Sequence, residues 1–212
     1  MQAFSDRLAT KYTDALDETG RDYLKRMRDA SQQMQILIND LLGLSRISTL
    51  AQPFAKVDLN MIAREALSDL EDSIERTQAR VEIGDLPTLQ ADPTQMHQLL
   101  QNLVGNALKF HQDDIPPIIK VSAQVKGKEC QISVEDNGIG FDVQYLDRIF
   151  KPFQRLHSRE EYEGSGMGLA ICRRIAERHG GSITATSAVG KGSAFLVTLP
   201  IRHPKETNDE QA

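Results

Sequence analysis

The sequence predicts an α+β fold, in which helices cover one face of a largely antiparallel sheet, preceded by a helical segment. After residue 55, short apolar runs of strand length alternate with amphipathic runs of helix length, and hairpin-type connections join neighbouring strands. Before that point, residues 22–50 form one uninterrupted helical pattern. Residues 51–55 separate the two parts, because Pro53 lacks an amide hydrogen and restricts the residue before it.

Composition and charge limit the classes of protein to consider. The 212 residues are 40% hydrophobic and 26% charged, as in an ordinary globular protein. The net charge of −5 and the lack of a long basic block argue against nucleic acid as a partner. No apolar run reaches the length of a membrane span, and no signal peptide opens the chain. Cys130 and Cys172 form no metal-type cluster, so we expect two reduced, buried thiols in a cytoplasmic protein.

The first 50 residues predict helices. Residues 1–13 have a polar helical pattern, residues 16–20 indicate a loop, and residues 22–50 predict one long helix. Apolar side chains recur along the long helix at alternating spacings of three and four, at Met27, Ala30, Met34, Leu37, Leu41 and Leu44. This stripe fits either a helix packed on its own domain or a coiled-coil or four-helix-bundle dimer. We favour the dimer, because the short first segment cannot cover the whole stripe.

The elements after residue 55 are closely spaced. Asp92 is the expected N-cap of a helix with Pro93 in its first turn, and Gly180 is expected to end a later helix. In chain order we expect a strand at 57–59, a helix at 59–76, strands at 79–83 and 88–91, a helix at 93–110, strands at 118–124 and 130–134, a short helix within 141–153, a helix from 164 to 180, strands at 182–186 and 193–199, and a charged tail at 202–212.

A carboxylate followed by two glycines stands where the strand at 130–134 ends. The strand would carry Asp136 to its edge, and Gly138 and Gly140 would let a ligand approach the backbone. A purine ring suits this arrangement, because the carboxylate accepts from an exocyclic amine while the glycines leave room. An ordinary Asp-Asn-Gly turn explains the same residues.

Three polar side chains share one face of the predicted helix at 93–110. Asn102, Asn106 and Lys109 have the spacing i, i+4, i+7. An amide oxygen is a suitable ligand for Mg²⁺, and a lysine supplies a charge for phosphate, although an ordinary solvated face fits the same residues. Gly105 costs about 1 kcal/mol relative to alanine in a helix interior, which indicates close approach of another element.

Three more glycines, at positions 164, 166 and 168, precede the next helix. Backbone amides at a helix start can bind an anion, and the helix dipole favours one. A dinucleotide-binding strand is not expected before them, because residues 159–163 are polar and charged. The chain lacks a GxxxxGK[ST] run and the HRD and DFG motifs, which argues against a P-loop and against a protein kinase of the Ser/Thr type.

Taken in order, these motifs resemble the catalytic domain of bacterial sensor histidine kinases, within the wider ATPase superfamily that includes gyrase, Hsp90 and MutL. The resemblance covers residues 56–201. Four segments are similar to the family's N, G1, F and G2 boxes, namely residues 102–110, 136–140, 150–155 and 164–169. Residues 190–200 are similar to its closing strand. Each box alone is unspecific, whereas four boxes in this order are specific.

The resemblance implies a two-layer α/β sandwich of the Bergerat type that binds ATP and Mg²⁺. Asp136 would bind the adenine amine, Asn106 would coordinate Mg²⁺ and Lys109 would contact phosphate. Residues 142–163 would form a lid over ATP, with Phe150 and Phe153 as its anchors. The ATP-binding residues implied in this way are Asn102, Asn106, Lys109, Phe110, Asp136, Gly138, Gly140, Phe150, Phe153, Arg155, Gly164, Gly166, Gly168 and Leu169, of which Arg155 would reach the phosphates.

The same resemblance implies transfer of the γ-phosphate of ATP to a histidine in two-component signalling. Residues 1–50 resemble part of an antiparallel dimerisation and phosphotransfer hairpin, and residues 51–55 a linker. The implied partners are a response-regulator receiver domain, an upstream sensor domain and a second copy of the chain bound through the hairpin. None of the histidines has the context of a phosphoacceptor, so we expect that this chain does not phosphorylate itself: they are His97, His111, His157, His179 and His203.

Two alternatives remain open, a hydrolysing ATPase of the same superfamily and a nucleotide-binding dimerisation module without kinase activity. In the gyrase-like relatives, a glutamate in the place of Asn102 activates water. A neutral amide cannot act as a general base, which favours transfer to a protein side chain over hydrolysis.

Overall fold

The structure is a computed structural model that describes residues 7, 10, 16–49, 52–158, 161–162 and 164–202. It divides into two compact units, Met1–Ser45 and Arg46–Ala212. Of the helix predicted at 1–13 only residues 7 and 10 are described, and both are helical. The charged tail predicted at 202–212 lies outside the described residues except for residue 202. The domain boundary predicted at 51–55 stays a prediction.

Most of helix α2 (Glu18–Thr49) belongs to the first unit. The loop predicted at 16–20 is wrong for its last three residues, because the Asp17 carboxylate accepts from the Gly20 amide at 2.7 Å and so allows the helix to begin earlier. In this single chain the apolar stripe is largely exposed, as Met27, Met34 and Leu41 show with 59%, 49% and 53% exposure. The dimer that would cover it stays a prediction.

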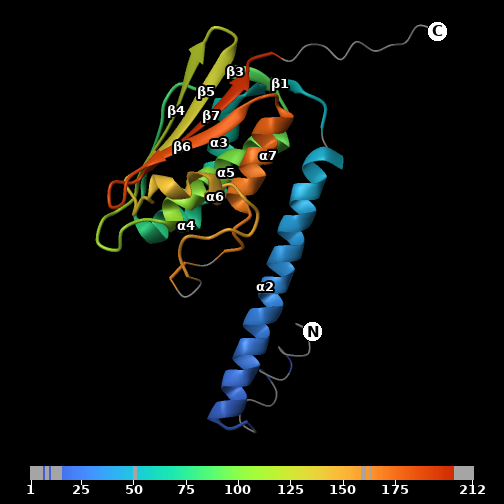
Figure 1. Ribbon diagram of the computed structural model, residues 1–212, viewed down its shortest axis with the longest axis vertical. Helices are drawn as coiled ribbons and strands as arrows, with labels where there is room; N and C mark the ends of the chain where they lie inside the picture. The colour runs from blue at the N-terminus through green and yellow to red at the C-terminus, as the bar shows by residue number, and fades with distance from the viewer. Residues whose placement is uncertain are drawn as a thin grey trace, which may run out of the picture. The chain divides into compact units, whose positions relative to one another are not determined.

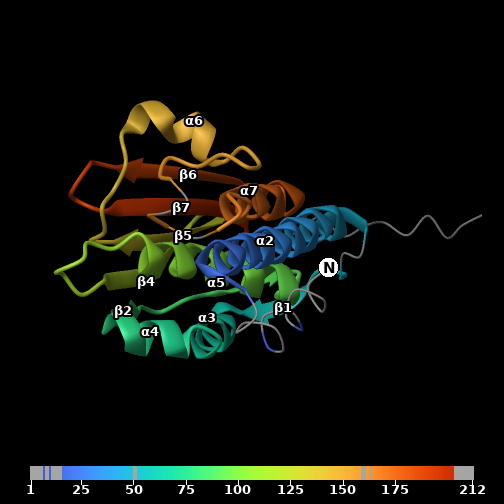
Figure 2. The same ribbon diagram turned by 90° about the horizontal axis from the view of Figure 1, so that it is seen from below.

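The second unit is built on a five-stranded sheet with the order β2-β4-β5-β7-β6. Figure 1 shows the sheet, and Figure 2 labels all five strands. The pair β2–β4 is parallel and the other three pairs are antiparallel. A separate antiparallel pair joins β1 to β3. The strands are β1 (Ala55–Asp58), β2 (Arg80–Ile83), β3 (Thr88–Ala91), β4 (Ile118–Lys126), β5 (Glu129–Asp136), β6 (Ser182–Ser187) and β7 (Ser193–Pro200). The predicted α+β class with a largely antiparallel sheet is confirmed.

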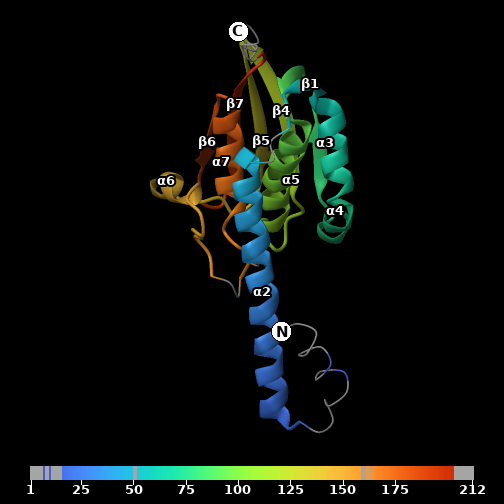
Figure 3. The same cartoon turned by 90° about the vertical axis from the view of Figure 1, so that its right-hand side faces the viewer.

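Helices cover one face of this sheet, as Figure 3 shows for α3, α5 and α7. Side chains alternate along each strand, so Cys130, Ile132 and Val134 of β5 are buried beneath the helices. The helices of this layer are α3 (Leu59–Ser68), α4 (Glu71–Thr77), α5 (Pro93–Lys109) and α7 (Gly168–Arg178). Among the described residues, none of the helices is long and apolar enough to cross a membrane.

Two predicted helices have different bounds in the structure. The helix expected at 59–76 is interrupted between α3 and α4, because the Leu70 amide bonds the Leu67 carbonyl in a tighter turn. The helix expected from residue 164 begins only at Gly168, since Gly164 and Gly166 have φ of +134° and +76°. The short helix expected within 141–153 is confirmed as two pieces, the 3₁₀ turn η2 (Val143–Tyr145) and α6 (Leu146–Ile149). Figure 2 shows α6 on the β6 side of the sheet, away from α3 and α4.

Gly105 lies inside α5, and none of the described residues presses against it, contrary to the close approach that its position indicates. Among those residues, a Cβ added there would meet only Leu70 Cδ2, at an ordinary contact distance of 3.9 Å. We therefore expect Gly105→Ala to raise the free energy of unfolding by about 1 kcal/mol, because alanine loses less backbone entropy in a helix. Urea unfolding of the nucleotide-free chain measures this change, and a loss of stability would show that Leu70 cannot accommodate the methyl group.

Candidate functional site

Asp136, the last residue of β5, holds the loop that follows it. Its Oδ1 accepts from the Gly138 amide at 2.8 Å and from the Ser193 amide at 3.1 Å. Burial raises the pKa of its carboxyl, although these two backbone hydrogen bonds oppose the shift. No partner is recorded for Oδ2 among the described residues, so that oxygen can accept a hydrogen bond from a ligand.

The loop after Asp136 passes very close to the end of α5. The Ile139 amide donates to the Phe110 carbonyl at 2.9 Å. A Cβ on Gly138 would lie 2.2 Å from that carbonyl oxygen, so only glycine fits here. The close contact brings the segment predicted to bind adenine beside the helix predicted to bind metal and phosphate.

The polar face of α5 meets the glycine segment before α7. A Cβ on Gly168 would be 3.4 Å from Asn102 Oδ1, and one on Gly164 would be 2.7 Å from Lys109 Nζ. Lys109 Nζ also lies 4.5 Å from the centre of the Phe110 ring. Asn102 Nδ2 is buried and makes no regular hydrogen bond among the described residues, although it lies near enough to the Cys172 thiol to oppose the rise of that thiol's pKa.

The segment predicted as a lid packs on Phe110 through aromatic rings. Tyr162 lies 5.0 Å from Phe110, and His157 lies 5.3 Å from Tyr162, between ring centres. Arg155 joins the two ends of the loop from residue 155 to residue 164. Its guanidinium donates to the carbonyl of Gly164 at 2.6 Å and to that of Tyr162. The end of the predicted lid at residue 163 lies outside the described residues, and contact of Arg155 with phosphate stays a prediction.

The two predicted lid anchors differ. Phe150 is 6% exposed and therefore buried, as an anchor should be. Phe153 is 51% exposed, so its burial does not support an anchoring role, which stays a prediction. Its φ of +61° is unfavourable for a side chain of this size, and it turns the backbone at the end of the segment Phe150–Phe153. Leu169 lies in the first turn of α7 and is half-buried.

A pocket of about 560 Å³ opens between the loop after Asp136 and the lid segment. Of the predicted site residues only Gly140 lines it. Six further lining residues lie in the lid predicted at 142–163, although none of them is singled out there: Asp142, Tyr145, Leu156, His157, Glu161 and Tyr162. The sequence analysis gives no role to the remaining four, which are Asp113, Ile139, Phe141 and Val189. Aromatic residues inside an otherwise polar lid were the signal that could have revealed Tyr145 and Tyr162.

The residues present fit Mg²⁺ bound together with nucleotide phosphates. In the described part of the chain, no group of three or more His, Cys, Asp or Glu side chains could hold a metal alone. Mg²⁺ commonly uses one or two protein oxygens together with phosphates and water. The side-chain oxygens of the half-buried Asn106 and Asn102 offer such a face, whereas Nδ2 of Asn102 can only donate a hydrogen bond.

Burial also raises the pKa of Cys130 to about 11 and of Cys172 to about 12. Both thiols are free and buried, as the sequence predicts. At neutral pH they are protonated, and they belong to the core rather than to the site.

The raised pKa of Asp136 predicts a pH dependence of stability. Its folded-state pKa lies above the ordinary 3.8, so its contribution is fully present below pH 3.8 and is lost as pH rises through the folded value. We expect the free energy of unfolding of the wild type, relative to Asp136→Asn, to fall across that interval. Urea unfolding at a series of acidic pH values measures the difference, and a difference independent of pH would contradict the burial argument.

Comparison with known proteins agrees with this geometry. Residues 91–203 match the family described as histidine kinase-, DNA gyrase B-, and HSP90-like ATPase. The chain therefore belongs to this family, and its ATP-binding part is of the sensor histidine kinase type.

Particular relatives support the same assignment. Over 194 residues the chain is 40% identical to the phytochrome-like protein Cph1 of Synechocystis sp., covering 92% of this chain and 26% of that protein. Over 191 residues it is 32% identical to the sensor protein kinase WalK of Staphylococcus saprophyticus, covering 86% and 31%. The chain thus spans about a quarter to a third of the length of these curated relatives.

Solved structures show the same fold. Full-length ShkA in complex with AMPPNP superposes with a TM-score of 0.68 at 27% identity, over 87% of this chain and 39% of that one. The nucleotide-free catalytic domain of the histidine kinase ThkA superposes with a TM-score of 0.61 at 26% identity, over 72% of this chain and 100% of that one.

Proposed function

We propose that this chain is the phosphoryl-donating part of a sensor histidine kinase, which binds Mg-ATP and transfers its γ-phosphate to a histidine outside residues 1–212. One observation carries the proposal. The Asp136 loop, the Asn102–Lys109 face of α5 and the glycines before α7 lie together around one site, although they are far apart in sequence.

Each part of this site has a chemical role. The Oδ2 atom of Asp136 accepts from the exocyclic amine of adenine, and Gly138 leaves room for the ring. Asn106 would hold Mg²⁺, with Asn102 beside it, and Lys109 would contact phosphate. Bound Mg²⁺ neutralises charge on the phosphates. The segment that includes Tyr162 closes over the nucleotide by packing on Phe110.

Phosphoryl transfer is favoured over hydrolysis by the amide at position 102. Asparagine has no carboxylate to take a proton from water, so it cannot act as a general base. An acceptor side chain brought in from outside the site supplies the nucleophile instead. Steady-state release of phosphate by the chain alone would favour the hydrolysing ATPase.

The proposal extends to the setting of the kinase. We propose that the acceptor histidine passes its phosphoryl group to a receiver domain of a response regulator, and that an upstream sensor domain controls the reaction. A dimer formed through α2 would bring acceptor and ATP together in the cytoplasm. The relatives named as sensor kinases and the exposed stripe of α2 support these expectations.

The experiment has two steps. Calorimetry first measures Mg-ATP binding by the 212-residue chain, which should bind without becoming phosphorylated. The protein is then extended upstream through an acceptor histidine and incubated with γ-labelled ATP. We expect label that is stable in base and labile in acid, as phosphohistidine is. Failure of the chain to bind nucleotide would overturn the proposal.

A further inference from the structure

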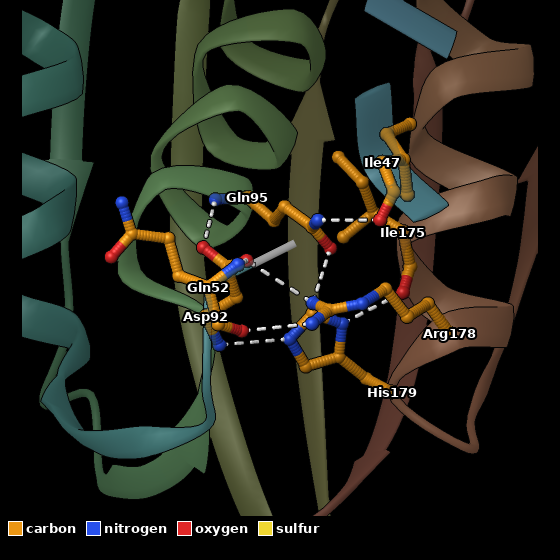
Figure 4. Close-up of polar contacts among 7 residues, drawn as sticks. All are labelled: Ile47, Gln52, Asp92, Gln95, Ile175, Arg178 and His179. Atoms are coloured by element: carbon orange, nitrogen blue, oxygen red, sulfur yellow. Dashed lines mark hydrogen bonds and ion pairs between the residues drawn. The ribbon is translucent and has the colours of Figure 1, made fainter. Parts of the chain in front are cut away.

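A buried polar cluster joins the ends of α5 and α7 that lie farthest from the ATP site. We call Asp92, Gln95, Arg178 and His179 the Asp92 cluster (Figure 4). Asp92, Gln95 and His179 are 1%, 5% and 0% exposed. Asp92 is the N-cap of α5, whereas Arg178 is the last residue of α7 and His179 its C-cap. Polar groups this deeply buried require hydrogen bonds.

The Asp92 cluster binds the chain just before β1 by its backbone. The amide of Gln52 donates to Asp92 Oδ2 at 2.8 Å, and its carbonyl accepts from Arg178 Nη2 at 2.8 Å. Gln95 Nε2 donates to the carbonyl of Ile47 at 3.0 Å. Both backbone groups of Gln52 and the last turn of α2 are thereby attached to the helix ends.

The contacts within the cluster orient these groups. Arg178 Nη1 donates to Asp92 Oδ2 at 3.1 Å and to Gln95 Oε1 at 2.9 Å. His179 Nδ1 donates to the Ile175 carbonyl at 2.8 Å, and its Nε2 accepts from the Asp92 amide at 3.0 Å. Since a carbonyl only accepts and an amide N–H only donates, the geometry selects one neutral tautomer.

The ring of Phe54 adds an apolar contact to the same attachment. Its centre lies 4.7 Å from the His179 ring and 4.7 Å from the Arg178 guanidinium carbon. The residues from Gln52 to Phe54 are therefore held by hydrogen bonds, by stacking and by a cation–π contact. The capping of α5 does not require this attachment of residues 52–54, because the N-cap uses only the bond from the Gln95 amide to Asp92 Oδ1 at 3.2 Å.

The helices attached here are the ones that carry the ATP site at their other ends. The face with Asn102 and Lys109 lies in the second half of α5, and α7 begins at Gly168, which packs on Asn102. With 11 and 17 residues, α7 and α5 are stiff elements of roughly 16 Å and 25 Å. The backbone at Ile47 and Gln52 is therefore held relative to the candidate ATP site.

We propose that the Asp92 cluster positions the chain that enters the ATP-binding unit, so that the acceptor histidine meets the γ-phosphate productively. This inference rests on the proposed function. Asp92 and Arg178 are positioning residues, since they lie at the ends of α5 and α7 opposite to the candidate ATP site. A misplacement of about 1 Å can cost on the order of 100-fold in rate, so loss of the attachment should slow transfer without weakening ATP binding.

Three variants test the attachment. Arg178→Gln removes the guanidinium group that donates to Gln52, Asp92 and Gln95. Asp92→Asn keeps a good N-cap, but its amide nitrogen would face the donors of Gln52 and Arg178. Arg178→Lys keeps the charge with fewer, less directed donors and should restore part of the activity. The matched control is Arg173→Gln, which removes an exposed arginine of α7 that pairs only with Glu177 among the described contacts.

Two measurements are made on each variant. Hydrogen exchange of the 212-residue chain should show the Gln52 amide exchanging at least about 10-fold faster in Arg178→Gln and Asp92→Asn, with protection of β5 unchanged. In the protein extended through its acceptor histidine, kcat for phosphorylation should fall at least about 10-fold while KM for ATP stays within about two-fold.

Other results would overturn the inference. One is an unchanged kcat although the Gln52 amide is released. Another is a rise in KM that accounts for the whole loss, which would place the effect in ATP binding. An Arg173→Gln variant as slow as Arg178→Gln would show that charge on α7, and not the attachment, matters. Failure of the proposed function is separate, because then the wild type itself binds no ATP or forms no phosphohistidine.

Discussion

Asp136→Asn should weaken ATP binding at least about 100-fold while leaving the fold intact. Oδ1 already accepts from the amides of Gly138 and Ser193, so the new side chain will keep its oxygen there. Its NH₂ group then takes the place of Oδ2 and faces the amine of adenine, donor against donor. Calorimetry with Mg-ATP measures the loss.

The same substitution should not destabilise the nucleotide-free chain. The buried carboxylate has a raised pKa, and a neutral amide of the same shape avoids that burial cost. Glu135→Gln is the matched control, because it removes an exposed carboxylate from the neighbouring position of β5, which points to the other face of the sheet. Binding by Asp136→Asn equal to that of the wild type would remove Asp136 from the site.

Gly140→Ala should lower the free energy of unfolding by at least about 3 kcal/mol and abolish ATP binding. Gly140 has φ of +60°, and an added Cβ would lie 2.1 Å from the Ala188 carbonyl oxygen and 2.9 Å from that of Gly192. The loop after β5 cannot move away, because the Ile139 carbonyl accepts from the Gly190 amide at 2.7 Å. Urea unfolding measures the loss.

Gly127 provides a control with the same backbone conformation. Its φ is +62°, yet nothing in the described part of the chain lies within 4 Å of an added Cβ. Gly127→Ala should therefore show only the cost of the left-handed conformation, about 1 kcal/mol, and bind ATP normally. If both variants lose equal stability, conformation and not close contact explains Gly140.

The largest differences between prediction and structure concern contacts between distant segments. The sequence places Asp136 at a strand end and Asn102, Asn106 and Lys109 on one helix face, because strand and helix periodicity are local. The neighbours of these side chains come from elsewhere. Packing of Gly168 on Asn102, or of Tyr162 on Phe110, depends on how α5, α7 and the lid are assembled.

The ends of helices and the burial of single side chains also depend on tertiary packing, which the sequence pattern does not predict. Periodicity predicts one helix over 59–76, whereas a tight turn at Leu70 divides it. The family resemblance implies two lid anchors, Phe150 and Phe153, yet Phe153 is exposed while Phe150 is buried. In each case the apolar pattern predicts the kind of element correctly, whereas tertiary packing decides where the element ends and which side chains are buried.

By itself the sequence determined the fold class, the order of the elements, the capping of α5 by Asp92 and the set of motifs that predicts an ATP site, because each depends on residues close together in the chain. Only the tertiary structure decided that the same Asp92 also binds Gln52 and Arg178, and that His179 is buried beside it. Those partners lie 40, 86 and 87 positions away, where no sequence periodicity reaches. Their meeting follows from the packing of α5 against α7 on the sheet.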